Sequence, residues 1–257
     1  MVTKNIFFGQ GSCMDNSTHG RENDSGDAQY AKTIISSISH ELSTSVAVIS
    51  SNIQLFQRFS YDISQQVRDE TFFLCGESLK DVSRFLDNIQ ILNSINKSRL
   101  TLENSTVDLK KSVRDLYREL KLMNLDHKRI ILKWKLRDKI IVCDRRLLSR
   151  ILINALSNSL KFSKEAVYLT ISTDSRGLFL TVQDHGIGIP ERQIDQVFQP
   201  FYRASNASHI AGVGLGLAIV YSLVQKVKGE IRLSSAIGEG VILKINIPYE
   251  CPRNTDH

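Results

Sequence analysis

No long apolar run occurs in this chain of 257 residues, and that absence excludes two classes of protein. The longest runs are short, such as residues 217–221, whereas a membrane span needs roughly 18–20 consecutive apolar residues. The apolar stretch near the N-terminus, residues 6–8, is shorter than the roughly 7–15 residues of a signal-peptide core. We therefore expect no membrane span within the chain, no secretion and a cytoplasmic location.

Cysteine is also scarce, whereas positive charge is in excess. The four cysteines have no metal-ligand spacing, which favours free thiols in a reducing compartment. The formal net charge is +6, and residues 110–150 hold fourteen Lys and Arg against five Asp and Glu. A nucleic-acid face is one interpretation, but no aromatic interleaving or recognition motif accompanies the charge. A solvated basic surface, or one that steers an acidic partner or nucleotide, is favoured, and we expect no nucleic-acid partner.

The first part of the chain is a polar segment followed by helical periodicity. Residues 9–29 hold little apolar surface, so residues 1–29 are predicted to be a flexible tail or linker. Apolar residues then recur at helical spacings, and residues 72–93 form a heptad seam after a turn near 60–64. The expected structure is an antiparallel helical hairpin over residues 30–98. A lone hairpin exposes its apolar stripe, so two chains would close a dimeric four-helix bundle.

The remaining pattern mixes helices with hairpins and shows neither βαβ alternation nor an internal repeat. The predicted helices cover 109–123, 144–162 and 215–227, and the predicted strands cover 130–136, 139–143, 167–173, 178–182, 230–234 and 241–247. Asp144 is placed to cap the second of these helices. The expected fold class is α+β, with an α/β sandwich over residues 104–250 and a tail at 251–257.

A first group of reactive side chains lies on the first helix of the hairpin. His40 falls off the apolar seam, and Thr44 lies one helical turn further on the same face. A neutral imidazole is a nucleophile near pH 7, and the carboxylate of the adjacent Glu41 can accept its other proton. A lone helical histidine is also a common surface residue, so that alternative stays open at this point.

A second group lies on one face of the helix predicted at 144–162. Asn154, Asn158 and Lys161 are spaced i, i+4 and i+7, although asparagine is unfavourable inside a helix. An amide oxygen suits a hard cation such as magnesium, and a lysine suits a phosphate. The pattern therefore indicates a polar ligand, the alternative being a solvated helix face.

Two glycine-rich segments follow. Asp184, with Gly186 and Gly188, comes directly after a predicted strand, and its carboxylate can accept from the exocyclic amine of a purine. Residues 212–216, with glycine at every second position, open a helix whose first amides can face phosphate. They follow a polar loop, 202–211, and not a strand, which disfavours a dinucleotide-binding motif. That loop is predicted to be a lid over a nucleotide.

Together these segments resemble, in order and spacing over residues 30–250, the core of the sensor histidine kinases. The resembling segments are the H box at 40–42, the N box at 154–162, the first glycine box at 184–188, the F box at 198–201 and the second glycine box at 212–216. The resemblance implies a dimerisation and histidine-phosphotransfer hairpin followed by a Bergerat-type ATP-binding domain. It also implies ATP-dependent autophosphorylation of a histidine, then phosphoryl transfer to an aspartate in the receiver domain of a response regulator.

The resemblance further implies roles for single residues of the hairpin. His40 would be the phosphoacceptor and Glu41 the base that orients or deprotonates it. Thr44 would orient the water that dephosphorylates the regulator. Ser45 stands where the family often has proline, which puts the usual helix kink in doubt but not the chemistry.

For the ATP-binding domain the resemblance implies that Asn158 holds Mg²⁺ and that Asp184 reads adenine. Asn154 and Lys161 would contact phosphate or support that contact. The other implied ATP-site residues are Phe162, Gly186, Gly188, Arg203, Gly212, Gly214 and Gly216. One rival is a plain ATPase or chaperone on the same fold, but such relatives usually carry a glutamate where this chain has Asn154. The other is a non-enzymatic dimeric scaffold, against which Asn158, Asp184 and the five glycines argue.

Overall fold

The computed structural model describes residues 2–5, 39, 42–58, 64–97, 100–210 and 212–249. His40, Glu41 and most of the turn predicted at 60–64 lie outside the described residues. The chain divides into two compact units, Gln10–Asn93 in one and Met1–Gly9 with Ser94–His257 in the other. None of the described helices combines the length and the hydropathy that crossing a membrane demands.

The described part of the first unit is helical. Residues 42–58 form a helix, and α2 (Gln65–Asn96) follows. The rings of Phe56 and Phe72 lie 4.9 Å apart between centroids, which joins the end of the first helix to the start of α2. The seam residues Phe72, Leu79 and Leu86 of α2 are 62%, 58% and 49% exposed. A single chain therefore leaves the apolar stripe of α2 largely uncovered.

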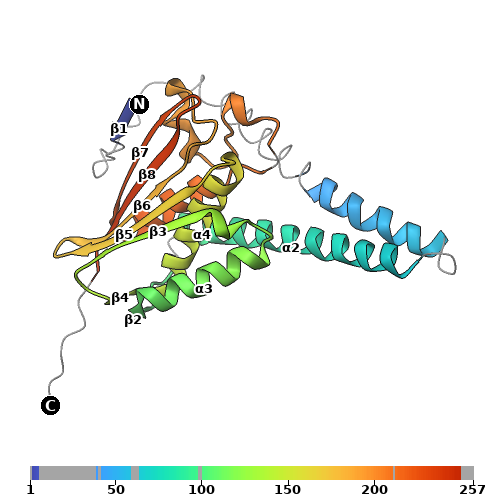
Figure 1. Ribbon diagram of the computed structural model, residues 1–257, viewed down its shortest axis with the longest axis horizontal. Helices are drawn as coiled ribbons and strands as arrows, with labels where there is room; N and C mark the ends of the chain where they lie inside the picture. The colour runs from blue at the N-terminus through green and yellow to red at the C-terminus, as the bar shows by residue number, and fades with distance from the viewer. Residues whose placement is uncertain are drawn as a thin grey trace, which may run out of the picture. The chain divides into compact units, whose positions relative to one another are not determined.

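The second unit is built on a sheet of six strands in the order β1-β7-β8-β6-β5-β3 (Figure 1). A separate two-stranded sheet pairs β2 with β4. Neighbouring strands are antiparallel except β3 and β5, which are parallel. The strands are β1 (Val2–Asn5), β2 (Asn104–Asp108), β3 (Ile130–Leu136), β4 (Ile140–Asp144), β5 (Val167–Asp174), β6 (Gly177–Gln183), β7 (Glu230–Ala236) and β8 (Gly240–Ile247).

Helices α3 (Leu109–Leu122), α4 (Arg145–Phe162) and α5 (Gly216–Lys226) complete this unit, with short 3-10 turns at η1 (His127–Arg129), η2 (Glu191–Gln193), η3 (Gln196–Phe198) and η4 (Ser205–Ala207). An aspartate caps each of the first two helices. Asp108 Oδ1 accepts from the Lys111 amide at 2.9 Å, and Asp144 Oδ1 from the Leu147 amide at 3.0 Å. Each carboxylate satisfies an amide that the start of a helix leaves without an intrahelical partner. The cap predicted at Asp144 is thus confirmed.

The core lies between α4, α5 and one face of the large sheet. Alternate residues of β5 are buried, as expected for a strand with one face inside. Ile151 and Leu156 of α4 and Ile219 of α5 have no exposed surface. Because α4 and α5 pack against each other, the polar segments at their adjoining ends are held together.

The expected α+β class is confirmed, with three differences in detail. Residues 2–5 belong to the segment predicted as a tail, yet they form β1 and pair with β7, so the prediction is wrong for them. The sequence does not predict β2 because only Val107 among its five residues is buried. It also does not predict the parallel pair, because β3 reaches β5 through β4 and α4 and not through a simple strand–helix–strand alternation.

Candidate functional site

The polar face of α4 has an inner and an outer part. Asn154 is buried, and its Nδ2 donates to the carbonyl of Arg150 at 2.8 Å, within its own helix. Asn158 is half-buried one turn later, and Lys161 is exposed near the end of the helix. The i, i+4, i+7 face exists as predicted, but its first amide already bonds within the helix, whereas Asn158 and Lys161 lie toward the surface.

Asp184 follows β6 and is the most deeply buried carboxylate of this region, at 3% exposure. Its Oδ1 accepts from the backbone amides of Gly186 at 3.0 Å and Val241 at 3.3 Å. The Ser159 hydroxyl of α4 also favours the charged form of this carboxylate. Burial raises the pKa of Asp184, because the loss of solvation outweighs these hydrogen bonds. The carboxylate is thus fixed in orientation in a weakly solvated place, which suits recognition of a hydrogen-bond donor.

The loop after Asp184 is tied closely to α4 and β7. A β-carbon on Gly186 would lie 2.3 Å from the Phe162 carbonyl oxygen, and one on Gly188 would lie 1.9 Å from that of Ala236. Gly188 also has φ +66°, a region that side chains rarely adopt. The Phe162 carbonyl accepts from the Ile187 amide at 3.2 Å. Phe162 therefore contacts this loop through its backbone carbonyl, which accepts the hydrogen bond.

The second glycine-rich segment lies against the outer part of the α4 face. A β-carbon on Gly212 would lie 2.6 Å from Lys161 Nζ, and one on Gly216 would lie 2.7 Å from Asn158 Nδ2. Gly216 is the first residue of α5, and Leu215 before it gives no side-chain cap. The open amides of the helix start therefore lie beside an amide side chain and an ammonium group. Helix starts of this kind attract anions, and phosphate is the common one.

The predicted lid is a folded loop, held by its own polar groups. Arg203 Nη2 donates to the carbonyls of Ala207, at 2.6 Å, and Ile210. Asn206 Nδ2 donates to the Gly188 carbonyl at 2.9 Å, which ties the loop to the first glycine segment. Arg203 thus shapes this loop, and its predicted contact with a nucleotide stays a prediction.

The F-box segment connects the same loop to α5. The Phe198 ring lies 5.6 Å from that of Tyr221 between centroids. The Phe201 amide donates to the Gly214 carbonyl at 3.0 Å, and a β-carbon on Gly214 would lie 2.5 Å from the Tyr202 carbonyl oxygen. Gly214 therefore allows the lid to lie directly against the start of α5.

Sequence reasoning missed two contributors to this site. Ser159 lies between Asn158 and the apolar residues of α4, and nothing in its spacing distinguishes it from a core serine. Gly240 was predictable only as a turn residue, yet a β-carbon there would lie 2.1 Å from the Asp184 carbonyl oxygen. That Gly240 lies next to Asp184 could be predicted only if the pairing register of β6 with β8 were known.

Of the predicted residues on the hairpin, the structure describes only Thr44. Thr44 lies on the exposed side of the helix at 42–58, while His40 and Glu41 are outside the described residues. Among the described residues no group of three or more His, Cys, Asp and Glu side chains could hold a metal ion. An amide oxygen such as that of Asn158, together with the phosphates of a ligand, is a ligand set that suits Mg²⁺.

Residues 143–250 match the family described as histidine kinase-, DNA gyrase B-, and HSP90-like ATPase. The chain is 24% identical over 234 residues to the sensor histidine kinase WalK of Bacillus subtilis, covering 89% of this chain and 38% of WalK. It is 27% identical over 229 residues to the sensor histidine kinase AtsR of Burkholderia thailandensis, covering 85% of this chain and 37% of AtsR. It thus spans well under half the length of these curated relatives.

The fold has a counterpart among solved structures. The histidine kinase AdeS of Acinetobacter baumannii matches with a TM-score of 0.61 and 24% identity, covering 81% of this chain and 97% of the AdeS chain. At that identity the likeness concerns the fold alone.

Proposed function

We propose that the chain is a protein histidine kinase of a two-component system, with residues 143–250, which match the ATPase family named above, as its catalytic domain. In this proposal it phosphorylates its own His40 from ATP and passes the phosphoryl group to an aspartate in the receiver domain of a response regulator. The family implies ATP binding. The reaction, its partner and the residue roles are our proposal.

The nucleotide would lie between the two glycine-rich segments. Asp184 would accept from the adenine amine, beside Gly186 and Gly188, because its carboxylate is fixed by amides of the same loop. Asn158 and Lys161 would face the phosphates at the start of α5, where Gly212 and Gly216 leave room. Asn158 would hold Mg²⁺, which would neutralise negative charge on the phosphates. Asn154 would support this arrangement from inside α4.

The chemical step follows from positioning and charge neutralisation, as for phosphoryl transfer generally. The neutral imidazole of His40 would attack the γ-phosphorus while Glu41 orients it or accepts its proton. The bond to the ADP oxygen breaks as the bond to nitrogen forms. The phosphoryl group then moves from this nitrogen to a carboxylate oxygen of the regulator, which restores the free histidine.

The apolar seam of α2 supports a homodimer. Phe72, Leu79 and Leu86 are about half exposed or more in the single chain. Two hairpins that pack along this seam would bury these side chains in a four-helix bundle. Thr44, which is exposed and follows His40 by four residues in the sequence, would orient a water against the phosphorylated regulator and give the protein a second, phosphatase activity.

The observation that carries the proposal is the meeting of Asn158 and Lys161 with the open start of α5, in the same unit as the buried Asp184. Incubation with γ-labelled ATP tests it. We expect acid-labile, alkali-stable label on the wild type and none on His40→Gln, with ATP affinity nearly unchanged in the variant. His127→Gln, in the other unit, is the matched control and should keep its label. Acid-labile label retained by His40→Gln would falsify the assignment.

A further inference from the structure

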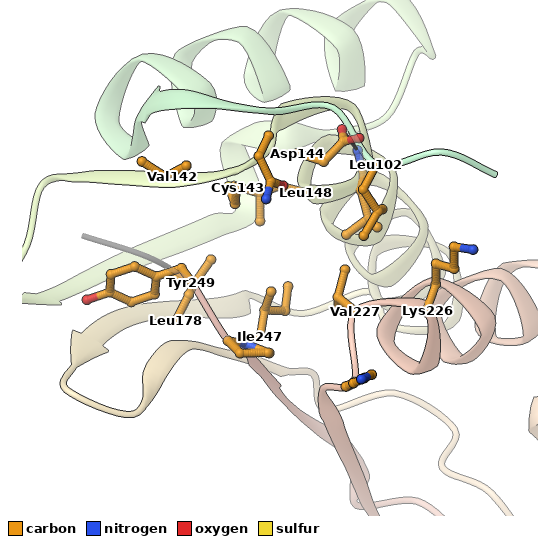
Figure 2. A pocket seen from close by; sticks show the side chains of 14 residues that line it. Leu102, Val142, Cys143, Asp144, Leu148, Leu178, Lys226, Val227, Ile247 and Tyr249 are labelled. Atoms are coloured by element: carbon orange, nitrogen blue, oxygen red, sulfur yellow. Dashed lines mark hydrogen bonds between the residues drawn. The ribbon is translucent and has the colours of Figure 1, made fainter. Parts of the chain in front are cut away.

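A cavity of about 310 Å³ lies at the opposite end of the sheet unit from Asp184. Figure 2 shows Val142, Cys143 and Leu148 on one side of it, with Leu178, Ile247 and Tyr249 on the other. The first three belong to β4 and α4, and the others belong to the large sheet and the residues after β8. The cavity is thus an apolar space between the two sheets, of the size in which small ligands bind.

This cavity is separate from the nucleotide residues. Leu178 is near the start of β6, whereas Asp184 follows its end. Ile247 ends β8, whereas Gly240 begins it. A strand of this length spans about 20 Å, so a ligand in one site does not touch the other.

The acidic and hydroxyl groups that line the cavity are already satisfied. Asp144 accepts from the Leu147 amide through Oδ1, and from the Glu103 amide at 2.9 Å through Oδ2. The Tyr249 hydroxyl donates to Asp138 Oδ2 at 2.6 Å. Burial raises the pKa of the Cys143 thiol to about 11, so it is neutral at pH 7. These groups therefore do not favour a cationic ligand in the cavity.

Two lysines border the cavity, and no carboxylate among the residues that the structure describes forms an ion pair with either. Lys226 is in the last turn of α5, and Figure 2 places it beyond Val227 at the side of the cavity. Lys228 also lines the cavity, and its φ is +55°. This left-handed position at the end of a helix normally holds glycine. A lysine there is unfavourable for the backbone, which points to a use for its charge.

We propose that this cavity binds a small amphipathic anion, with its apolar body between Leu148 and Leu178 and its carboxylate or sulfonate at Lys226 and Lys228. The apolar lining supplies burial of the body, and the two ammonium groups supply charge complementarity. The site is independent of the proposed kinase reaction.

Three probes of equal chain length separate charge from burial: octanoate, 1-octanol and octylammonium. Binding to the full chain is followed by calorimetry and by the methyl NMR signals of Leu148 and Leu178. We expect saturable shifts of these signals, with octanoate binding most tightly, octanol about fivefold more weakly and octylammonium weakest. Equal affinity for the three probes, or shifts confined to methyl groups of α2, would overturn the proposal.

Variants test the contribution of the lysines. The double change Lys226→Gln with Lys228→Gln should weaken octanoate about fivefold and leave octanol unchanged, whereas Lys244→Gln, an exposed lysine of β8, should change neither. Lys228→Gly should raise the melting temperature by a few degrees and still weaken octanoate. The proposal fails if the double variant and Lys244→Gln weaken octanoate equally. It also fails if Lys228→Gly binds octanoate like the wild type.

Discussion

At Asp184, burial and hydrogen bonding act on one carboxyl in opposite directions. Two backbone amides and the Ser159 hydroxyl favour the charged form, but the loss of solvation is larger, so its pKa is raised. A carboxyl whose pKa is raised in the folded state destabilises that state as the pH rises from the unfolded value of 3.8 toward the folded one. The chain thus keeps an acid that costs stability at neutral pH, which indicates a use other than folding.

Asp184→Asn tests this use. The amide keeps an acceptor oxygen for the loop amides but loses the charge, so we expect the melting temperature at pH 7 to stay equal or rise. ATP affinity should fall about 5- to 150-fold, the effect of losing one buried, hydrogen-bonded partner. Calorimetric titration with ATP and GTP, beside thermal unfolding at several pH values, measures both. A variant that unfolds earlier and binds ATP normally would contradict the role.

Asn158→Ala should weaken ATP binding only when magnesium is present. The side chain lies beside the start of α5 and would contribute its oxygen to the metal and not to the base. We expect a loss of about 5- to 150-fold with Mg²⁺ and little change in EDTA. Ser157→Ala, on the same helix, is the control. An equal loss of ATP affinity in both buffers would mean that Asn158 supports the structure of the site and does not bind the metal.

Thr44→Ala should separate two activities. Thr44 is exposed and follows His40 by four residues in the sequence, and the proposed autophosphorylation does not use its hydroxyl. The variant should still label itself and pass phosphoryl to its regulator, but no longer speed the regulator's dephosphorylation. The decay of phosphorylated regulator is compared for wild type, variant and no kinase. If variant and wild type speed decay equally, Thr44 has no such role.

At the scale of elements, α2 is the clearest case of a surface that the single chain does not complete. Its 32 residues are about 48 Å long. Large apolar side chains along the seam remain exposed although the helix packs against its neighbour through Phe56 and Phe72. Exposed apolar area of this kind marks an interface.

If the proposed dimer forms along this seam, Leu79→Glu should convert it to monomer, because two buried carboxylates would face each other across the seam without partners. Sedimentation velocity over a range of concentrations measures this. Gln66→Glu introduces the same charge on α2 outside the seam and should leave the dimer intact. A wild type that sediments as a monomer at all concentrations would refute the bundle.

At the scale of the whole molecule, local signals were predictable and long-range pairings were not. The Asp144 cap, the neighbouring strands β5 and β6 and the polar face of α4 follow from residues close in sequence, whereas the Asp108 cap was not predicted. β1 and β2 carry almost no apolar signal and are defined by distant partners. At the site, Asp184 and its glycines were evident, but the placement of Ser159 beside Asp184 and the close approach of Gly240 depend on how α4 and β8 pack.

The pairing of β1 with β7 has a consequence for synthesis. Val2 lies opposite Ser235, so the strand made first waits for a partner that is 233 positions away in the chain. At about 5–20 residues per second, that interval is on the order of ten to fifty seconds on the ribosome. Until β7 emerges, β1 has no strand edge to join, whereas the helical segment α2, which lies between them in the sequence, can already form from local contacts. Closure of this edge therefore belongs to the end of folding, and a reporter at Val2–Asn5 would record when the sheet is complete.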